Sequence, residues 1–320
     1  MCTAINYTRG GHIFGRTLDY EYSYGESVVV VPKEHPLHFI YEGTMGSHPA
    51  IIGMAHVSDG RALFYDAMNE SGLCMAALNF PILADYKRPS SDKINLASFE
   101  VITYILSHAE SVSDALTILN DVNVTSDSAA PNLMPTPLHY ILADRLGAVT
   151  IEPCEFGLMI YDNPLGVLTN SPSFDYHMLH LTEYMRLSPT PPENKIAPRL
   201  PIIPYSRGMG AIGLPGDYSS GSRFIRAAYA KENTEPSGSA VIDFFHVIST
   251  VEVPSGLSTS EDSQPVRTIY TSAIDTERKI YYYKTYSSLG VTAIHMDRCE
   301  LDGERLQKFP LIDAPLNDIE

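Results

Sequence analysis

The sequence contains no tryptophan and only four cysteines among its 320 residues. The cysteines stand at Cys2, Cys74, Cys154 and Cys299, so no two of them form a CxxC pair or another spacing typical of metal ligands. A disulfide framework and a structural zinc site are therefore not expected. So few scattered cysteines are typical of a protein from a reducing compartment.

Basic residues are also scarce. The 22 lysines and arginines face 38 aspartates and glutamates, which gives a formal net charge of -16, and the basic residues nowhere form a run. Because phosphate contacts dominate nucleic-acid affinity, this composition excludes a DNA- or RNA-binding protein, and it equally disfavours docking on an anionic membrane. No apolar run is long enough to span a membrane, and the first residues show neither a secretory nor a transit pattern. We expect a cytoplasmic protein.

The first eighty residues have the pattern of successive strands. Residues 27–31 form a β-branched run that stops at Pro32, and residues 50–57 form another apolar run. Residues 62–80 predict a hairpin whose turn is supplied by residues 69–72, NESG.

Helical spacing follows over residues 96–108, and Ser111 opens a capping-box pattern for a helix through Leu119. Four strands are predicted between residues 138 and 170 and a helix over about 174–186. Two more helices follow, one capped by Ser220 and running through Ala230 and one over 240–251, and strands close the chain. Blocks of strands and helices, without one-by-one alternation, indicate an α+β layered domain over residues 1–320. Residues 188–221 are rich in Pro and Gly and form either a long excursion or a linker.

Three motifs suggest cofactor or metal chemistry but lack the context it needs. Residues 10–17 have P-loop spacing with arginine in place of lysine, yet an aromatic, β-branched stretch follows where a helix is required. Residues 208–213 fit GxGxxG, but no clear strand precedes them and a proline follows closely. His177 and His180 lie three apart on a predicted helix, a pair that is more often solvent-facing or core than metal-binding. We expect no cofactor and no metal.

Cys2 follows the initiator methionine. A small second residue favours removal of Met1, which would leave Cys2 with both a thiol and a free α-amine. The α-amine has an ordinary pKa of about 7.7 to 8.0, so near neutral pH it can take a proton from the thiol. One residue would then supply nucleophile and base, although a cysteine at this position is also a common accident of sequence.

Several segments, in this order, resemble the choloylglycine hydrolases, also called linear amide C-N hydrolases. They are MCTAI at 1–5, FGRTLDYEYSYGE at 14–26, NESGLCMAALNFP at 69–81, LTNSPSFDYH at 168–177, SRGMGAIGLPGDYSSGSRFIRAA at 206–228, YTSAID at 270–275 and IYYYKTY at 280–286. The resemblance spans nearly the whole chain. It implies an N-terminal-nucleophile hydrolase with a four-layer αββα fold, in which two stacked antiparallel sheets lie between helix layers.

The resemblance also implies the catalytic residues. Cys2 matches the nucleophile, and Arg16 and Asp19 match the arginine and aspartate of a GRxxD motif, the arginine beside the thiol and the aspartate near the α-amine. A fixed cation beside a thiol favours the thiolate. Without the motif, Arg16 would be read as a surface salt bridge and Asp19 as a turn cap.

Three further positions follow from the same resemblance. Asn79 and Asn170 match the oxyanion-hole and amine-orienting asparagines, and Arg223 matches a further active-site arginine. Neutral amide donors suit an oxyanion hole because they do not titrate. From the residues alone, each asparagine is equally a strand-end residue bonded to backbone. The neighbouring Arg226 has no such match and is expected to be structural.

Within the family the resemblance is stronger to bile salt hydrolases. Asn79 stands where penicillin V acylases commonly have tyrosine, and an apolar pocket involving Leu18 and loops around 55–65 and 125–138 would accept a steroid acyl group linked to glycine or taurine. Penicillin V and acyl-homoserine lactones are the alternative substrates. An unprocessed binding relative without activity is the non-enzyme alternative. The excursion at about 188–216 resembles the segment through which relatives contact a neighbouring subunit, which implies a homotetramer.

Overall fold

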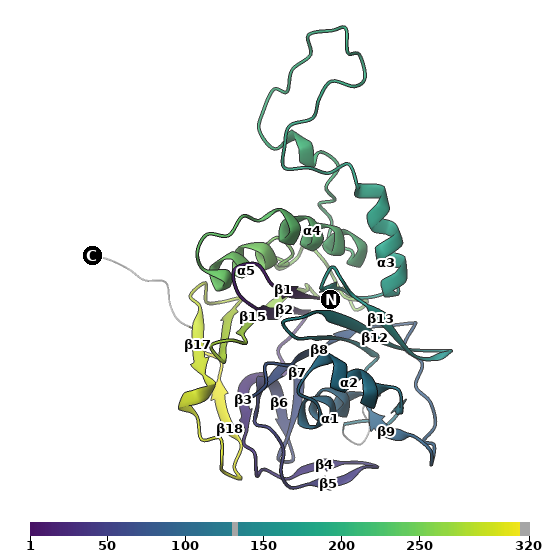
Figure 1. The fold of residues 1–320 in the computed structure, drawn as a ribbon, viewed down its shortest axis with the longest axis vertical. Helices are drawn as coiled ribbons and strands as arrows, with labels where there is room; N and C mark the ends of the chain where they lie inside the picture. The colour runs from purple at the N-terminus through teal and green to yellow at the C-terminus, as the bar shows by residue number, and fades with distance from the viewer. Residues whose placement is uncertain (130–133, 314–320) are drawn as a thin grey trace, which may run out of the picture.

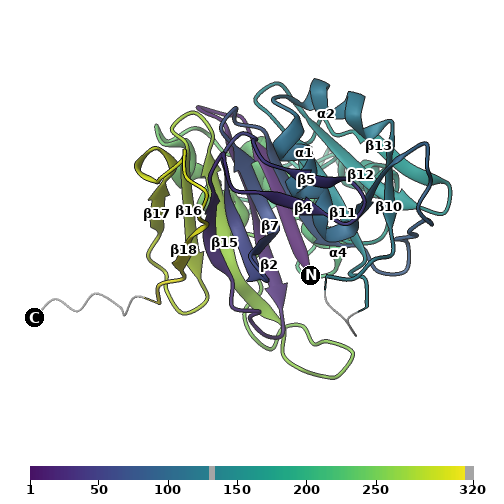
Figure 2. The same cartoon turned by 90° about the horizontal axis from the view of Figure 1, so that it is seen from below.

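The computed structural model describes residues 1–129 and 134–313. Two large antiparallel sheets lie face to face in the middle of the molecule (Figures 1 and 2). Sheet A has the order β14 (Val167–Leu168), β1 (Cys2–Tyr7), β2 (Ile13–Tyr20), β15 (Arg267–Asp275), β16 (Ile280–Thr285) and β17 (Thr292–His295). Sheet B has the order β13 (Gly157–Asp162), β12 (Ala148–Cys154), β11 (Leu138–Ala143), β8 (Cys74–Asn79), β7 (Arg61–Asn69), β6 (Ile51–Ser58), β3 (Ser27–Val31) and β18 (Gln307–Pro310).

Helices cover the outer face of each sheet (Figure 1). On sheet A, α4 (Ser220–Asn233) contacts β1 and β14, α5 (Ala240–Ser249) contacts β2 and β15, and α3 (Phe174–Leu181) packs beside α4. On sheet B, α1 (Val101–His108) contacts β7 and β8, and α2 (Val112–Leu119) packs against α1. The expected α+β fold with four αββα layers is thus confirmed. Within the described residues, none of the helices is long and apolar enough to cross a membrane.

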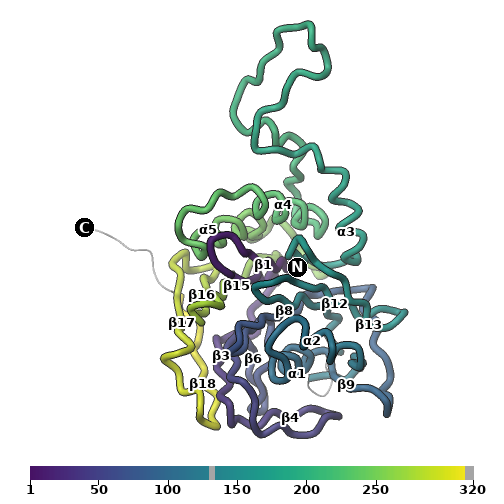
Figure 3. Tube along the Cα trace, viewed as in Figure 1, coloured from purple at the N-terminus to yellow at the C-terminus, as the bar shows by residue number. Residues whose placement is uncertain are grey.

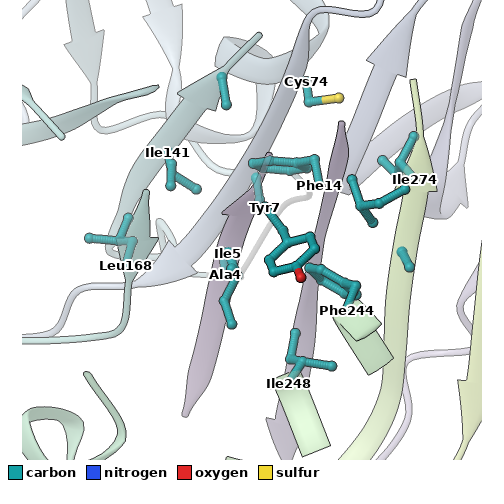
Figure 4. Close-up of a cluster of buried hydrophobic side chains, with 14 of the residues drawn as sticks. Ala4, Ile5, Tyr7, Phe14, Cys74, Ile141, Leu168, Phe244, Ile248 and Ile274 are labelled. Carbon is teal, nitrogen blue, oxygen red and sulfur yellow. The ribbon is translucent and has the colours of Figure 1, made fainter. Parts of the chain in front are cut away.

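The core explains why apolar runs in this sequence form strands. In β3 all five residues are buried: Val28 and Val30 join a cluster that fills the space between the sheets and continues under α4 and α5, whereas Val29 and Val31 join the cluster under α1. A strand buried on both faces needs a continuous apolar run, as the sequence has. Figure 4 shows the first cluster, in which side chains from β1, β2, β11 and β15 meet those of α5.

Several boundaries differ from the prediction. Residues 94–97 form β9 (Ile94–Ala97), which pairs in parallel with β10 (Val122–Thr125), so the helix expected from residue 96 begins only at Val101. The helix expected to reach residue 186 ends at Leu181 and continues as the 3-10 turn η2 (Thr182–Tyr184). Ser219 caps α4 in place of the expected Ser220, and the Ser111 cap of α2 is confirmed.

The remaining elements are short. The strands β4 (Leu37–Phe39) and β5 (Gly43–Met45) form a small hairpin at the edge of the molecule. Three further 3-10 turns are η1 (Ser98–Glu100), η3 (Met209–Ala211) and η4 (Met296–Arg298).

Residues 185–219 connect α3 to α4 as a long loop that projects from the body of the molecule (Figure 3). Its GxGxxG segment, residues 208–213, lies against the start of the loop, where the Ser188 amide donates to the Gly210 carbonyl at 3.0 Å. Gly208 has a φ of 79°, and a Cβ on Gly210 would lie 2.0 Å from the Thr190 carbonyl oxygen, so glycine is required at both positions. Large apolar side chains are exposed along the loop: Met185, Ile196, Leu200, Ile202, Ile203, Tyr205 and Ile212.

Candidate active site

The β1–β2 hairpin places the candidate nucleophile between the two sheets. Cys2 pairs with Leu18 and Ala4 pairs with Arg16. Directly opposed residues in an antiparallel pair share a face, so Cys2, Arg16 and Leu18 all project toward sheet B. Cys2 and Leu18 are both buried. The alternation of the GRTLD segment thus sets the arginine and the leucine on the face of the thiol and the aspartate on the other.

Met1 extends this hairpin by one residue. Its amino group donates to the Asp19 carbonyl oxygen at 2.7 Å, and the Asp19 amide donates to the Met1 carbonyl at 2.9 Å. The Asp19 carboxylate accepts hydrogen bonds from Thr268 Oγ1 at 2.6 Å and Thr17 Oγ1 at 3.1 Å. Asp19 therefore meets the N-terminus through its backbone, while its buried carboxylate is held by two hydroxyl groups.

Asn170 links the backbone of Cys2 to two other candidate residues. Its Oδ1 accepts hydrogen bonds from the Cys2 amide at 2.8 Å and from Arg223 Nη2 at 2.6 Å, and its Nδ2 donates to the Asn79 carbonyl at 2.7 Å. Both groups at Oδ1 are donors, which fixes the orientation of the amide. One side chain thus joins Cys2, Asn79 and Arg223, which lie far apart in the sequence.

The backbone of Asn170 is also held on both sides. Its amide donates to Ser220 Oγ at 2.8 Å, and its carbonyl accepts from His177 Nε2 at 2.9 Å. Burial lowers the pKa of His177 to about 4, so the ring is neutral and carries its proton on Nε2. Sequence reasoning missed both residues as parts of the site, although residues 168–177, which carry the family resemblance, include His177.

Arg223 is fully buried in the first turns of α4. Its Nη1 donates to the Cys2 carbonyl and to Thr3 Oγ1, and its Nε donates to the Tyr218 carbonyl at 3.1 Å. Burial lowers the pKa of Arg223, and the charges of Asp19 and Cys2 oppose that shift. Arg226, which was expected to be structural, donates to the backbone carbonyls of Thr250, Pro215 and Asp217, which agrees with that expectation.

Arg16 crosses the space between the sheets. Its Nη1 donates to the carbonyls of Tyr65 and Ala77 in sheet B. Burial opposes its charge, but attraction to Cys2, Tyr270 and Asp66 outweighs burial and raises its pKa. Within the described residues its buried Nη2 has no hydrogen-bond partner. Arg16 is therefore a permanent cation near Cys2 with one donor left for a further acceptor.

Asn79 ends β8 and lies opposite Leu138 of β11. Its carbonyl accepts the bond from Asn170, whereas its own carboxamide makes no hydrogen bond within the described part of the chain. The side chain is partly exposed. Its backbone carbonyl is linked to the Cys2 nitrogen through the Asn170 side chain, and a free amide donor at this strand end is suited to a ligand oxygen.

The motifs rejected from the sequence have structural roles. Residues 10–17 lead into strand β2 and not into a helix. His177 bonds to Asn170, and His180 stacks on Tyr176. Among residues 1–129 and 134–313, no group of three or more His, Cys, Asp and Glu side chains is arranged to hold a metal ion.

Comparison with known proteins gives one consistent result. Residues 2–309 match the family model of linear amide C-N hydrolases, choloylglycine hydrolase family. A bile salt hydrolase/transferase from Lactiplantibacillus plantarum is 41% identical over 314 residues, which cover 97% of each chain.

Two solved structures extend the comparison to the fold. The C2A mutant of the conjugated bile acid hydrolase from Clostridium perfringens is 31% identical and superposes with a TM-score of 0.93 over 100% of both chains. A penicillin V acylase from Agrobacterium tumefaciens, 21% identical, covers 96% of this chain and 90% of its own with a TM-score of 0.75, so it shares the fold. With Cys2 at the start of β1, beside the arginine and asparagines that the resemblance implied, the chain belongs to the choloylglycine hydrolase family of linear amide C-N hydrolases.

Proposed function

We propose that this enzyme hydrolyses the amide bond of conjugated bile salts, with Cys2 as nucleophile once Met1 is removed. The observation that carries the proposal is the bond between the Cys2 nitrogen and Asn170 Oδ1, at 2.8 Å. After processing that nitrogen is the α-amine, and an acceptor on one of its hydrogens orients its lone pair. The resemblance of the chain to proteins named for bile salt hydrolysis supports the substrate class.

The reaction proceeds through a thioester. The Cys2 α-amine takes the thiol proton, and the sulfur attacks the amide carbon of the substrate. The Asn79 carboxamide and a backbone amide hold the resulting oxyanion. The protonated amine then gives its proton to the leaving nitrogen, which releases glycine or taurine. Water, deprotonated by the same amine, attacks the thioester and frees the bile acid and the thiol.

The charged residues set the protonation states. Arg16 is the cation on the thiol's face of the hairpin and favours the thiolate. Arg223 holds the Cys2 carbonyl and Asn170 together, so it fixes the nitrogen and its acceptor relative to each other. The buried Asp19 carboxylate stabilises the protonated amine that forms when the thiol loses its proton.

The substrate is a small anion, whereas the protein carries a net charge of -16. Long-range steering therefore opposes binding, and burial of the steroid supplies most of the affinity. Leu18 pairs directly with Cys2 and forms part of the acyl pocket in this proposal. The loop predicted around residues 55–65 is the β6–β7 hairpin, which forms another part of the pocket in this proposal. In the loop predicted around 125–138, residues 130–133 lie outside the described residues.

Turnover of three substrates tests the substrate class. The enzyme and its Cys2→Ala variant are assayed with taurocholate, glycocholate and penicillin V, with an acyl-homoserine lactone as a fourth arm. We expect release of taurine or glycine by the enzyme alone. If the enzyme hydrolysed penicillin V or the lactone but no bile salt, the proposed substrate class would be wrong. Full activity of Cys2→Ala would refute the assignment of Cys2 as the nucleophile.

Removal of Met1 is a separate requirement. The intact mass of the purified protein is expected to lack one methionine. A protein that retains Met1 and still turns over bile salts would rule out the α-amine as base, and a retained Met1 without activity would favour the binding relative.

We also propose a homotetramer that acts in the cytoplasm. The exposed apolar side chains of residues 185–219 support contact with neighbouring subunits, and four unpaired cysteines agree with a reducing compartment. Light scattering is expected to give four times the chain mass. Replacing Ile203 and Tyr205 with serine should lower the measured mass. A wild-type protein that scatters as a monomer would contradict the proposed homotetramer.

A further inference from the structure

His139 and Glu152 form a fully buried pair that the mechanism above does not use. Tyr140 of β11 pairs with Ile151 of β12, so the next residues outward, His139 and Glu152, face each other. Their Nδ1 and Oε1 atoms lie 3.1 Å apart. Tyr140 packs in the cluster under α1, and strand side chains alternate, so His139 points to the other face, toward sheet A.

The ring of His139 contacts the segments of both candidate asparagines. Nε2 lies 2.8 Å from the carbonyl oxygen of Thr169, the residue before Asn170. The ring also stacks on Phe80, the residue after Asn79, with centroids 4.3 Å apart and planes 10° from parallel. One buried side chain therefore spans the two segments that hold the amine-orienting amide and the free amide donor.

The geometry fixes the proton on Nε2. A carbonyl oxygen only accepts, so Nε2 must donate to Thr169. Glu152 Oε1 already accepts from the Phe174 amide at 3.0 Å and also faces Nδ1. Whether the remaining proton lies on the ring or on the carboxyl group, Nε2 keeps its own, and the bond to Thr169 persists in both forms.

We propose that His139, oriented by Glu152, is a positioning residue that sets the distance between the Asn79 and Asn170 amides in the active site. It acts through Thr169 and Phe80 and touches neither substrate nor Cys2. The inference rests on the proposed function, because the spacing matters only if both amides serve one reaction. A misplacement near 1 Å of a reacting group can cost about 100-fold in rate.

Two substitutions at His139 separate the two contacts. His139→Phe keeps the stack on Phe80 and removes the donor to Thr169, whereas His139→Gln retains a donor near Nε2 and loses the stack. We expect kcat for taurocholate to fall about 10- to 100-fold in His139→Phe, with KM within about threefold of wild type. His139→Gln should recover part of that loss, a pattern that a purely structural role would not produce.

Glu152→Gln tests the orienting partner. Glu152 Oε1 both accepts from the Phe174 amide and faces Nδ1, so a carboxamide can serve only one of the two contacts. With its nitrogen in the place of Oε1 it donates to Nδ1 and preserves the proton on Nε2, while the bond from the Phe174 amide is lost. We expect kcat within about threefold of wild type. If His139→Phe does not fold, the comparison of His139→Gln, which should be slower, with Glu152→Gln carries the test.

His12→Gln is the matched control. His12 is also buried and uses both ring nitrogens, on Thr276 Oγ1 and Asn6 Oδ1 at 2.7 Å each, but it lies at the far end of the β1–β2 hairpin. It should lose stability and keep kcat. The positioning role is overturned if the His139 variants lose stability but keep kcat within twofold, or if only KM rises. Absence of bile-salt turnover by the wild-type enzyme would instead refute the proposed function.

Discussion

The two ends of the β1–β2 hairpin are both buried and both polar, yet they differ in how their polar groups are satisfied. At the end with Tyr7 and Ile13, both ring nitrogens of His12 are bonded by neighbouring side chains. The Tyr7 hydroxyl at this end has no hydrogen-bond partner within the described residues, but its ring packs against Phe244 in the apolar core, away from Cys2. At the end with Cys2 and Leu18, Arg16 Nη2 and the Asn79 carboxamide have no partner within the described residues. A closed polar network stabilises a fold, whereas unused donors next to a nucleophile are available to a ligand.

Replacing the nucleophile should give the largest difference between the two ends. Cys2→Ala removes the thiol and is expected to lower kcat by about 10⁴-fold or more, while the urea midpoint stays near that of wild type. His12→Gln should instead lower the urea midpoint and leave kcat near that of wild type. Amide release from taurocholate and urea unfolding followed by fluorescence check both. A Cys2→Ala enzyme with more than a few per cent of wild-type activity would contradict the assignment.

The two asparagines of this comparison give the next largest effect. Asn79→Ala removes a side chain that makes no hydrogen bond to any other described residue, so kcat should fall about 10²- to 10³-fold, equivalent to 2.7–4 kcal/mol of barrier. Its stability should change by less than about 0.5 kcal/mol. Asn6→Ala breaks the bond to His12 and should cost about 1–3 kcal/mol of stability with kcat unchanged.

If Asn79→Ala instead lost stability and kept kcat, the open end of the hairpin would be structural as well. In that case the contrast between the ends would no longer identify the active site. Kinetics and unfolding are measured on the same preparations, so the two effects can be separated.

The sequence predicted what is encoded locally. The β-branched run of β3 and the NESG turn between β7 and β8 lie within a few residues, and both were found. Strand β9 was missed because its four residues form a strand only by pairing with β10, which follows two helices later. Because the apolar residues that follow have helical spacing, the last two residues of β9 were predicted as the start of a helix.

The site needed information that no local pattern holds. Cys2 and Asn170 lie 168 residues apart, and from the sequence only the family resemblance placed both in one active site. His139 lies in a segment with an ordinary strand pattern, and Glu152 lies in the next one. Their opposition depends on the register of β11 and β12, which the sequence does not reveal. The pairing of His139 with Glu152 could therefore not be predicted from the sequence.

Acid should affect both ends of the hairpin alike, because each has a buried neutral histidine. Burial lowers the pKa of His12 and of His177 to about 4, against about 6.5 in the unfolded chain. Between pH 6.5 and 4 the unfolded chain binds protons that the folded chain does not, so stability falls as pH falls. Each histidine contributes up to about 3 kcal/mol of this loss, and nothing above pH 6.5.

Urea unfolding from pH 7 to 4.5 checks this dependence. His12→Gln should be less stable than wild type at pH 7 but lose less on acidification, so the two curves should converge. Parallel curves would show that His12 is protonated in the folded protein, which its burial and its two hydrogen bonds disfavour. Because His12 lies at the closed end, kcat per folded molecule should follow the wild-type pH profile. A change in that profile would mean that the two ends of the hairpin are coupled, and the distinction between a structural and a catalytic network would have to include β1 as a whole.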